Sequence, residues 1–348
     1  MQNAGVPNVI MTLVRQLHER YIFDLVQFSD KSGHFDKEFQ QYGGLIHRLS
    51  LIDCDAHKAQ YSLRGAQIYK ALQRILKGQS YVAMHCHCGV EAGICLQVAK
   101  EMKIPCRISH AHGTYRNVGV NIFRRSYFDY CRKQIQKCAT EKLACSQLAG
   151  ETLFLDDQFQ NVLNPVDTTY YAKIEQRLHE EVNLLQIGYM NENKNQMFSV
   201  RLLQALRNHG VNAHLTLIGY VVDEGYYARL IECIETEKLG GCVHFLPSNV
   251  DKRQAFGTMD YTLLPSRSEG LPLVALESQA AGILCLMSEH VPKDANLGGA
   301  LHLPYDDVEA WVEEILKEHD VDWPAVQIRL KSLSPNEFAR KIGAIYES

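Results

Sequence analysis

Residues 261–282 read YTLLPSRSEGLPLVALESQAAG and join an apolar run, a short polar loop and a helical pattern. The run at 261–266 predicts a buried strand, and the residues after Gly270 predict a helix. Glu269 stands in the loop between them, and Glu277 follows after seven intervening residues. Open α/β sheets bind ligands at the carboxyl ends of their strands, so this stretch predicts that Glu269 lies at a ligand site.

Similar apolar runs recur along the chain with helical patterns between them. They are YVAMHCHCG (81–89), RISHAHG (107–113), KLACS (142–146), NLLQIG (183–188), AHLTLIG (213–219), VHFLP (243–247) and ILCLMS (283–288). Strands that alternate with helices indicate βαβ units and parallel sheets. The sequence therefore predicts an α/β fold of two doubly wound, Rossmann-like domains.

The length of 348 residues favours two domains over one. Pro165 follows a predicted strand and precedes a charged stretch, so we place the domains at residues 1–165 and 166–325. The segment 326–348 ends in a helix that begins at Pro335, and we expect it to pack back on the first domain.

Composition excludes several classes of protein. No run of about 18 apolar residues predicts a membrane span, and the first residues lack the pattern of a signal peptide. The 11 cysteines have no regular spacing, which favours reduced thiols over a disulfide framework. We therefore expect a cytoplasmic protein.

The loop and helix around Glu269 have the features of a phosphate and ribose site. Gly270 lets the backbone approach a ligand, and Pro272 at the first helical position leaves the amides of Leu271 to Leu273 available for an anion. Glu277 lies about one and a half turns into the helix, where its carboxylate can accept hydrogen bonds from two ribose hydroxyls. Alternatively, Glu269 is a solvated loop acid and Glu277 an exposed helical one.

This stretch resembles the retaining nucleotide-sugar glycosyltransferases of family 4, which have the GT-B architecture, and especially bacterial exopolysaccharide and capsule enzymes. The resemblance extends over nearly the whole chain. Its signature residues are Pro265, Ser266, Glu269, Gly270, Leu273, Glu277, Ala280 and Gly282. It implies that Glu269 faces the donor sugar, that Glu277 binds the ribose, and that the amides of Gly270 to Leu273 hold the diphosphate.

The donor domain of that family supplies further expectations. In LLQIGYMNENKNQ, Gly188 allows close approach and Lys194 neutralises the leaving diphosphate. Tyr189 departs from the family, because most relatives have arginine there, and Arg267 is a candidate for the missing charge. We expect Gly219 near the phosphates, and we expect Ser248 to Val250 around the nucleobase.

Histidines on two predicted strands are candidates on the acceptor side. His112, with His110 as second choice, resembles the family's histidine that reaches the interdomain cleft, although a strand histidine is often structural. In MHCHCG, alternation sends His85 and His87 to one face and Cys86 and Cys88 to the other, so a single tetrahedral zinc site needs distortion. We expect no metal and no cofactor besides the nucleotide-sugar.

The start of the chain departs from the expected fold. A doubly wound domain opens with a buried strand and a glycine-containing loop, yet NAGVPNVIM resembles only the loop and the helix after it. We expect the first strand to be missing, and Gly5 stands where the family's glycine-rich loop ends. An empty slot exposes apolar surface and backbone groups, so we expect a marginal amino-terminal domain.

The segment 100–145 is basic, with ten lysines and arginines against three acids, although the whole chain has a net charge of -4. Within it, residues 115–142 mix basic with aromatic and aliphatic residues, which suits an anionic bilayer. The alternatives are a solvated helix face or nucleic-acid binding, and no motif accompanies the latter.

Two hypotheses for the function follow. In the first, the chain transfers a sugar from a nucleotide-sugar, with UDP as the expected nucleotide, to a lipid-linked or growing glycan, and it docks peripherally at the inner membrane face. In the second, it is a non-catalytic partner subunit that binds sugar nucleotides. The missing strand and Tyr189 motivate the second hypothesis.

Overall fold

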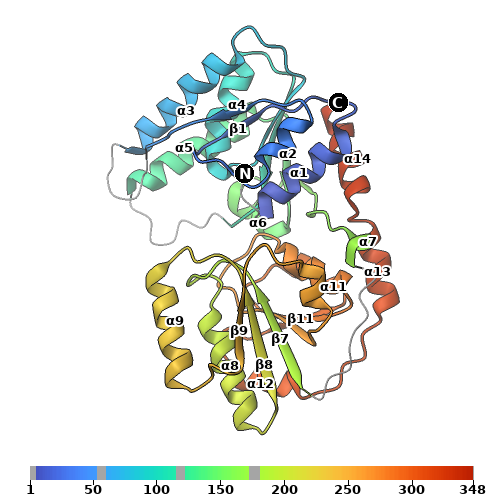
Figure 1. The fold of residues 1–348 in the computed structure, drawn as a ribbon. Helices are drawn as coiled ribbons and strands as arrows, with labels where there is room; N and C mark the ends of the chain where they lie inside the picture. Colours follow the sequence, from blue (N-terminus) through green and yellow to red (C-terminus); the bar gives the residue numbers. More distant parts are fainter. Residues whose placement is uncertain (1–4, 53–59, 115–121, 172–180, 348) are drawn as a thin grey trace. The chain divides into compact units, whose positions relative to one another are not determined.

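The computed structural model describes residues 5–52, 60–114, 122–171 and 181–347, and the chain divides into two compact units (Figure 1). Unit 1 comprises Met1–Pro165 and Pro335–Ser348, and unit 2 comprises Val166–Ser334. Each unit is an α/β domain with parallel strands, and the predicted fold class is confirmed. The ten cysteines among the described residues carry free thiols.

Unit 2 contains one parallel sheet of six strands in the order β12-β11-β10-β7-β8-β9. The strands are β7 (Val182–Ile187), β8 (Ala213–Ile218), β9 (Val243–Leu246), β10 (Tyr261–Leu264), β11 (Leu284–Ser288) and β12 (Ala300–Leu303). The helices are α7 (Thr168–Tyr171), α8 (Gln196–Asn208), α9 (Glu224–Thr236), α10 (Lys252–Phe256), α11 (Leu273–Ala280), α12 (Val308–Ile315) and α13 (Trp323–Lys331). The central strands are apolar on both faces because helices cover both sides of the sheet.

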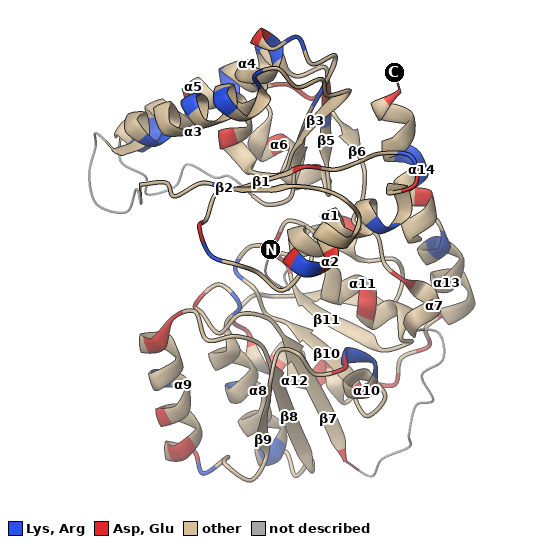
Figure 2. Ribbon diagram, turned by 45° about the horizontal axis from the view of Figure 1, so that its top comes forward, with Lys and Arg blue, Asp and Glu red and all other residues tan. Residues whose placement is uncertain are grey.

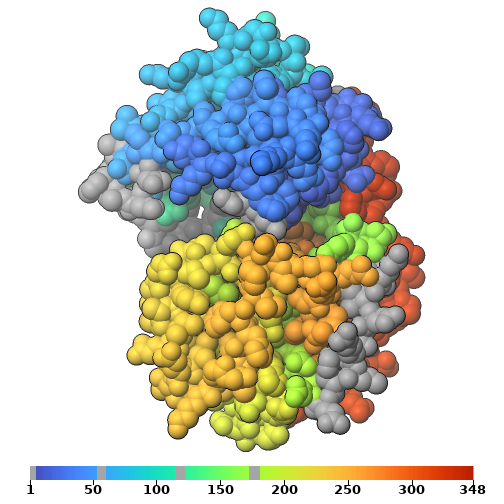
Figure 3. All heavy atoms as spheres, viewed as in Figure 1, coloured from blue at the N-terminus to red at the C-terminus, as the bar shows by residue number. Residues whose placement is uncertain are grey.

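Unit 1 contains two parallel sheets, one of two strands and one of four in the order β3-β4-β5-β6. The strands are β1 (Leu25–Gln27), β2 (Ile46–Arg48), β3 (Ala83–Cys86), β4 (Cys106–Ala111), β5 (Glu141–Ala144) and β6 (Gln160–Asn161). The helices are α1 (Gly5–Leu17), α2 (Asp36–Gln41), α3 (Gln60–Leu76), α4 (Ala92–Glu101), α5 (Ile122–Cys138), α6 (Gln147–Leu153) and α14 (Pro335–Tyr346). The blue residues from α1 to β2 cover one face of this unit in Figure 3.

All eight predicted strands are present, whereas β1, β2, β6 and β12 have no counterpart in the prediction. These four strands have two to four residues and lack the long apolar runs that mark a buried central strand. The sequence pattern therefore identifies the strands with clear apolar runs and misses four short ones.

The segment 326–348 is divided between the units, which corrects its prediction as one piece that packs back on the first domain. Val326 and Leu330 of α13 are buried within unit 2, and Gln327 Nε2 donates to the carbonyls of Gln279 and Ala280 at 3.3 and 3.2 Å. Only α14 belongs to unit 1. The reason is that the carbonyls at the end of α11 hold α13 in place.

Helix α14 packs with α1 over β4 and β5. Phe338 and Ile342 of α14 lie in one apolar cluster with Val9 and Leu13 of α1. A segment from the end of the chain thus completes the core of the first unit.

Replacing Phe338 with alanine should destabilise unit 1 by about 3–5 kcal/mol, because it removes a buried aromatic side chain and leaves a cavity. The exposed Lys341→Ala is the matched control on the same helix and should change stability by less than about 0.5 kcal/mol. Denaturant unfolding monitored in each unit tests this. Equal effects of the two variants would show that α14 does not contribute to the core.

Candidate active site

The candidate site of unit 2 lies where the strand order reverses. Strand β7 is the first of this sheet, with β8 on one side and β10 on the other. Lys194 follows β7 and Glu269 follows β10, so both residues stand at the carboxyl ends of adjacent parallel strands. Ligands of open α/β sheets bind at this reversal point.

Lys194 and Glu269 form an ion pair across this point. The Lys194 ammonium group donates a hydrogen bond to Glu269 Oε1, and the two side chains are 18% and 11% exposed. Both charged groups are therefore largely withdrawn from water but remain reachable. A diphosphate entering here would find an ammonium group beside a carboxylate that can accept sugar hydroxyls.

Hydrogen bonds join the two loops that carry this pair. Asn193 Nδ2 donates to the carbonyl of Ser268 at 3.0 Å, and the carbonyl of Asn193 accepts from the amide of Arg267 at 2.8 Å. Gln186 Nε2, from the buried end of β7, donates to the carbonyl of Lys194 at 2.6 Å. These hydrogen bonds hold the backbone on both sides of Lys194 and thereby fix the point from which its side chain extends.

Two glycines allow the loops after β7 and β8 to approach each other. A Cβ on Gly219 would lie 1.8 Å from the carbonyl oxygen of Gly188, which no side chain can tolerate. A Cβ on Gly188 would lie 3.2 Å from the Lys194 side chain. The close approach predicted at these glycines is therefore between two protein loops. The aliphatic part of the Lys194 side chain packs against the backbone of Gly188.

Glu277 has partners that sequence analysis missed. Both of its carboxylate oxygens accept from Lys252 Nζ at 2.9 Å, and its side chain is 13% exposed. Tyr171 of α7 is buried beside it, where burial first and the Glu277 charge second raise the pKa of the phenol. Lys252 lies two residues after Val250 but outside the family signature, so only the fold brings it to Glu277.

The remaining donor-side residues surround these pairs. Ser248 and Val250 are half-buried in the loop between β9 and α10, the helix that supplies Lys252. Gly270 and Leu271 are buried in the loop that leads to α11. Helix α11 begins at Leu273, so Pro272 is its N-cap in an extended conformation and not the predicted first helical residue.

Neither Tyr189 nor Arg267 supplies the positive charge that the family resemblance leads us to expect at position 189. The Tyr189 ring lies 6.5 Å from the Tyr220 ring. The guanidinium of Arg267 donates to Tyr305 Oη at 2.8 Å and pairs with Glu192 at 3.3 Å, and its side chain is 54% exposed. In this conformation Arg267 is held by other partners, and Lys194 is the cation in contact with Glu269.

Four histidines of unit 1 form one array at the carboxyl ends of β3 and β4. The rings of His85 and His87 are 4.1 Å apart, as are those of His110 and His112, and His87 Nδ1 lies 2.7 Å from His112 Nε2. Strand alternation predicts that His85 and His87 share one face and that His110 and His112 share one face. The two pairs meet only because β3 and β4 lie side by side in parallel register. His110 is fully buried and His112 is half-buried, so of these two His112 keeps accessible surface.

Three of these histidines form a candidate metal-binding cluster that sequence analysis did not predict. His85, His87 and His110 offer ring nitrogens that lie within 4.8 Å of one another. His85 already has partners at both nitrogens, because Nδ1 is 2.9 Å from Tyr346 Oη and Nε2 is 3.1 Å from His110 Nδ1. Cys88 lies instead near Cys95 of α4, at 4.0 Å between sulfurs. The expectation of no metal therefore remains a prediction.

Gly5 belongs to unit 1 and is the first residue of α1. A Cβ added there would meet no atom within 4 Å, so packing in this structure does not require a glycine. The described contacts thus join Lys194 with Glu269, Gly188 with Gly219, and Glu277 with Lys252, all within unit 2. His112 and Gly5 lie in the other unit.

Comparisons with known proteins show that the chain is similar to glycosyltransferases. Residues 181–319 match the family model described as Glycosyl transferases group 1. The chain is 26% identical over 337 residues to the putative glycosyltransferase EpsF of Bacillus subtilis, covering 91% of this chain and 85% of EpsF. It is 20% identical over 294 residues to the capsular polysaccharide biosynthesis glycosyltransferase CapH of Staphylococcus aureus, covering 83% of this chain and 79% of CapH.

The fold is shared with a solved structure at lower identity. The Anabaena protein HepE, crystallised with UDP and glucose, superposes with a TM-score of 0.76 at 13% identity, covering 100% of this chain and 97% of HepE. The fold, the family match and the curated relatives identify the chain as a glycosyltransferase with the GT-B fold. Within that class it is similar to bacterial polysaccharide enzymes such as CapH.

Replacing Gly219 with alanine should destabilise unit 2 by about 1–3 kcal/mol and displace the Lys194 loop, because the new Cβ collides with the Gly188 carbonyl. Gly240→Ala is the control, since a Cβ there meets no atom within 4 Å. Thermal unfolding of both variants tests the point. A Gly219→Ala protein as stable as the control would contradict the close approach of the two loops.

The histidine array should make unit 1 less stable as the pH falls below about 6.5. Burial lowers the pKa of His85 to about 3 and that of His112 to about 4, and it also lowers the pKa of His87 and His110. Histidines of the unfolded chain titrate near pH 6.5, so between that pH and about 4 the unfolded state binds more protons and folding weakens. Above pH 7 both states are neutral and the array adds no pH dependence.

The free energy of unfolding of unit 1, measured between pH 7.5 and 4.5, tests this. In His85→Gln, the slope of that free energy against pH should decrease by up to about 1.4 kcal/mol per pH unit. His209→Gln, an exposed histidine of unit 2, should leave that slope unchanged. An unchanged slope in His85→Gln would contradict a neutral buried imidazole.

Proposed function

We propose that this enzyme is a retaining glycosyltransferase of family 4 that transfers a sugar from a UDP-sugar to a lipid-linked or growing glycan in surface polysaccharide biosynthesis. The observation that carries the proposal is the Lys194–Glu269 pair at the reversal of the strand order, with Glu277 seven intervening residues further on. UDP is favoured because HepE was crystallised with UDP and with UDP-glucose. CapH and the amylovoran enzyme AmsK favour a polysaccharide product.

Each residue has a role in this proposal. When the donor binds, the Lys194 ammonium group contacts the diphosphate, either in place of Glu269 or together with it. Its positive charge then stabilises the departing UDP. Glu269 orients the donor sugar through its hydroxyls, and the acceptor hydroxyl attacks the same face of the anomeric carbon. Positioning and charge stabilisation thus replace a covalent nucleophile.

The nucleoside end of the donor would bind near Glu277. Its carboxylate has lone pairs beyond those that Lys252 occupies, so it can also accept ribose hydroxyls. Lys252 fixes the orientation of this partly buried acid before the nucleotide arrives. Ser248 and Val250, in the neighbouring loop, would contact the base.

The reaction as proposed needs no metal ion. A divalent cation can stabilise a departing diphosphate by neutralising charge on its oxygens, and here Lys194 and the backbone before α11 can supply that stabilisation. His112 keeps accessible surface at the carboxyl end of β4 and would contact the donor sugar.

We also propose that helix α5 docks the enzyme on the cytoplasmic face of an anionic membrane. At its start, Ile122 is 70% exposed and Phe123 42% exposed, next to the exposed Arg124 and Arg125. Figure 2 shows lysines and arginines along α3, α4 and α5. Apolar side chains beside arginines suit the boundary between headgroups and acyl chains.

Part of the basic segment 100–145 has a structural role instead. Arg107 donates to the carbonyls of Ile104, Pro105 and Cys138, and Arg132 is buried against the carbonyl of Thr152. Residues 115–121 of the predicted surface lie outside the described residues. No helix in the described part of the chain is both long and apolar enough to cross a bilayer.

The alternative function is a non-catalytic subunit that binds sugar nucleotides. Tyr189 favours it, because this position lacks the positive charge that most relatives have. The two functions differ in one observable, since a binding subunit takes up UDP-sugar without hydrolysing or transferring it.

Lys194→Ala should lower the turnover of UDP-sugar by about 10²–10³-fold, because one preorganised charge on the leaving group is lost. Lys317→Ala, an exposed lysine of the same unit, is the control and should retain full turnover. Turnover is measured as release of UDP with a panel of UDP-sugars, and NMR of the product gives its anomeric configuration. An inverted product would refute retention, and native protein that binds UDP-sugar without turnover would favour the alternative.

Replacing Arg124 and Arg125 with glutamine should weaken binding to vesicles containing phosphatidylserine by about 30-fold, since each basic residue contributes about 1 kcal/mol near the surface. Lys293→Gln with Lys331→Gln, two exposed lysines of unit 2, should leave binding unchanged. Sedimentation with anionic and neutral vesicles measures the partition. Equal loss in both double variants would contradict docking through α5.

A further inference from the structure

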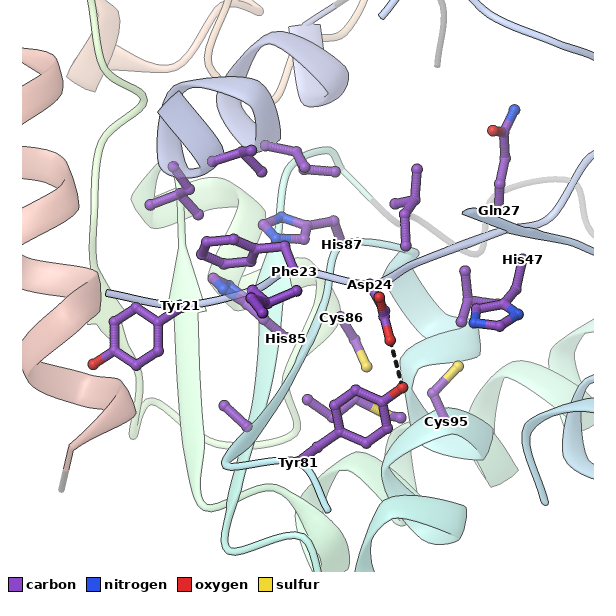
Figure 4. Close-up of a pocket in the computed structure, with 18 of the residues that line it drawn as sticks. Tyr21, Phe23, Asp24, Gln27, His47, Tyr81, His85, Cys86, His87 and Cys95 are labelled. Atoms are coloured by element: carbon purple, nitrogen blue, oxygen red, sulfur yellow. Dashed lines mark hydrogen bonds between the residues drawn. The ribbon is translucent and has the colours of Figure 1, made fainter. Parts of the chain in front are cut away.

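Four histidine rings of unit 1 lie close together where β3 and β4 end, and the proposed reaction gives a role to only one of them, His112. The other three are His85, His87 and His110, whose ring nitrogens lie within 4.8 Å of one another. Figure 4 shows two of these rings, His85 and His87, on β3. Imidazoles gathered in this way are a typical ligand set for a transition-metal ion.

The register of two strands brings the three rings together. His85 and His87 point to the same face of β3, because side chains alternate along a strand. His85 stands opposite Ile108 of β4, and the same register continued by two residues places His87 opposite His110. Sequence analysis considered a zinc site within MHCHCG alone and therefore did not include the ring from β4.

The spacing of the nitrogens suits a tetrahedral metal ion. His85 Nε2 lies 3.1 Å from His110 Nδ1. Two nitrogens bound to one zinc ion at about 2.0–2.1 Å are about 3.3 Å apart when the geometry is tetrahedral. The contact between these two rings therefore has nearly the length that a shared ion requires. The centre of the His87 ring lies 4.1 Å from that of His85 and 5.4 Å from that of His110, so His87 is close enough to supply a third nitrogen.

The outer nitrogens of two rings have the partners that metal-bound histidines usually have. His85 Nδ1 lies 2.9 Å from Tyr346 Oη, and His87 Nδ1 lies 2.7 Å from His112 Nε2. A histidine that binds a metal through one nitrogen donates the other N–H to such a group, which fixes the tautomer and the orientation of the ring. With an ion at His85 Nε2, the ring proton is on Nδ1 and is donated to the Tyr346 hydroxyl, which can accept as well as donate.

The cluster is enclosed, but an ion can reach it. His110 is fully buried, whereas His85 and His87 are half-buried and line the cavity of about 700 Å³ that Figure 4 shows. An ion can therefore approach the two rings of β3 from the cavity. His110 then supplies a nitrogen that is withdrawn from water and fixed by the β4 backbone.

We propose that His85, His87 and His110 form a binding site for one zinc ion, with a fourth coordination position open to water. Three histidines and one open position are an established coordination of zinc. The ligands are imidazoles only, whereas Mg²⁺ and Ca²⁺ prefer oxygen ligands. This site departs from the expectation of no metal, which was based on the histidines and cysteines of one strand.

The ion would connect two strands of unit 1 with the helix at the end of the chain. It would bind β3 and β4 directly, and through His85 it would orient Tyr346 at the end of α14. Because folding brings the three ligands together, the free energy of binding would add to the stability of unit 1. Sugar transfer as proposed proceeds without this ion.

Calorimetric titration with ZnCl₂ tests the site in the full chain, after treatment with EDTA and removal of the chelator. The native protein should bind one zinc ion tightly, and His85→Gln and His110→Gln should each weaken binding by at least about 100-fold, because a lost ligand costs at least as much as a lost outer partner. His214→Gln is the matched control. His214 of unit 2 lies 3.4 Å from His244 and 3.6 Å from Glu181, and its replacement should leave the affinity unchanged.

Two measurements on the native protein do not depend on how well the variants fold. Zinc at about 100 times its dissociation constant should shift the unfolding equilibrium of unit 1 about 100-fold toward the folded state and leave that of unit 2 unchanged. Co²⁺ in place of zinc should give the visible absorption of a tetrahedral site without the band that thiolate ligands add. Cys88→Ser, which removes the thiol nearest to His87 in the chain, should leave zinc binding unchanged.

Three outcomes would overturn the proposal. The first is absence of zinc binding by the native protein. The second is binding that His214→Gln or Cys88→Ser abolishes while His85→Gln and His110→Gln retain it, which would show an adventitious ion only. The third is a thiolate band in the cobalt spectrum, which would place the ion on cysteines. All of these readouts measure metal binding or stability, so they do not depend on transfer activity.

Discussion

The site depends on the adjacency of β7 and β10 in unit 2. Strands β8 and β9 and their helices lie between them in sequence, yet β7 and β10 pair side by side where the strand order reverses. Their carboxyl ends bring Lys194 and Glu269 into contact, and Asn193 joins the two loops through hydrogen bonds in both directions. Without that pairing, Lys194 would not reach Glu269.

The packing of the loops and helices that follow these strands also positions Gly219 and the second acid of the site, Glu277. Gly219 has no room for a side chain because the loop after β8 meets the backbone of Gly188 and Tyr189 after β7. Glu277 lies in α11, the helix that follows Glu269, and is held by Lys252, the first residue of α10. Four charged groups thus form two lysine–glutamate pairs in unit 2.

Sequence analysis identified the interior of both sheets and the acids of the site. Long apolar runs and the spacing of Glu269 and Glu277 are local signals, so they can be read without the fold. Lys252 and Tyr171 could not be found in this way, because their contact with Glu277 depends on how distant helices pack. The four-histidine array depended likewise on the register of β3 with β4.

Calorimetric titration with UDP tests the central claim most directly. The native protein should bind one UDP, and Glu277→Ala should weaken binding by at least about tenfold, because a hydrogen bond to a charged group contributes about 1.5–3 kcal/mol. Glu309→Ala, an exposed acid of the same unit, should bind UDP as the native protein does. Absence of UDP binding by the native protein, or equal affinity in all three proteins, would contradict a nucleotide site at the reversal of the strand order.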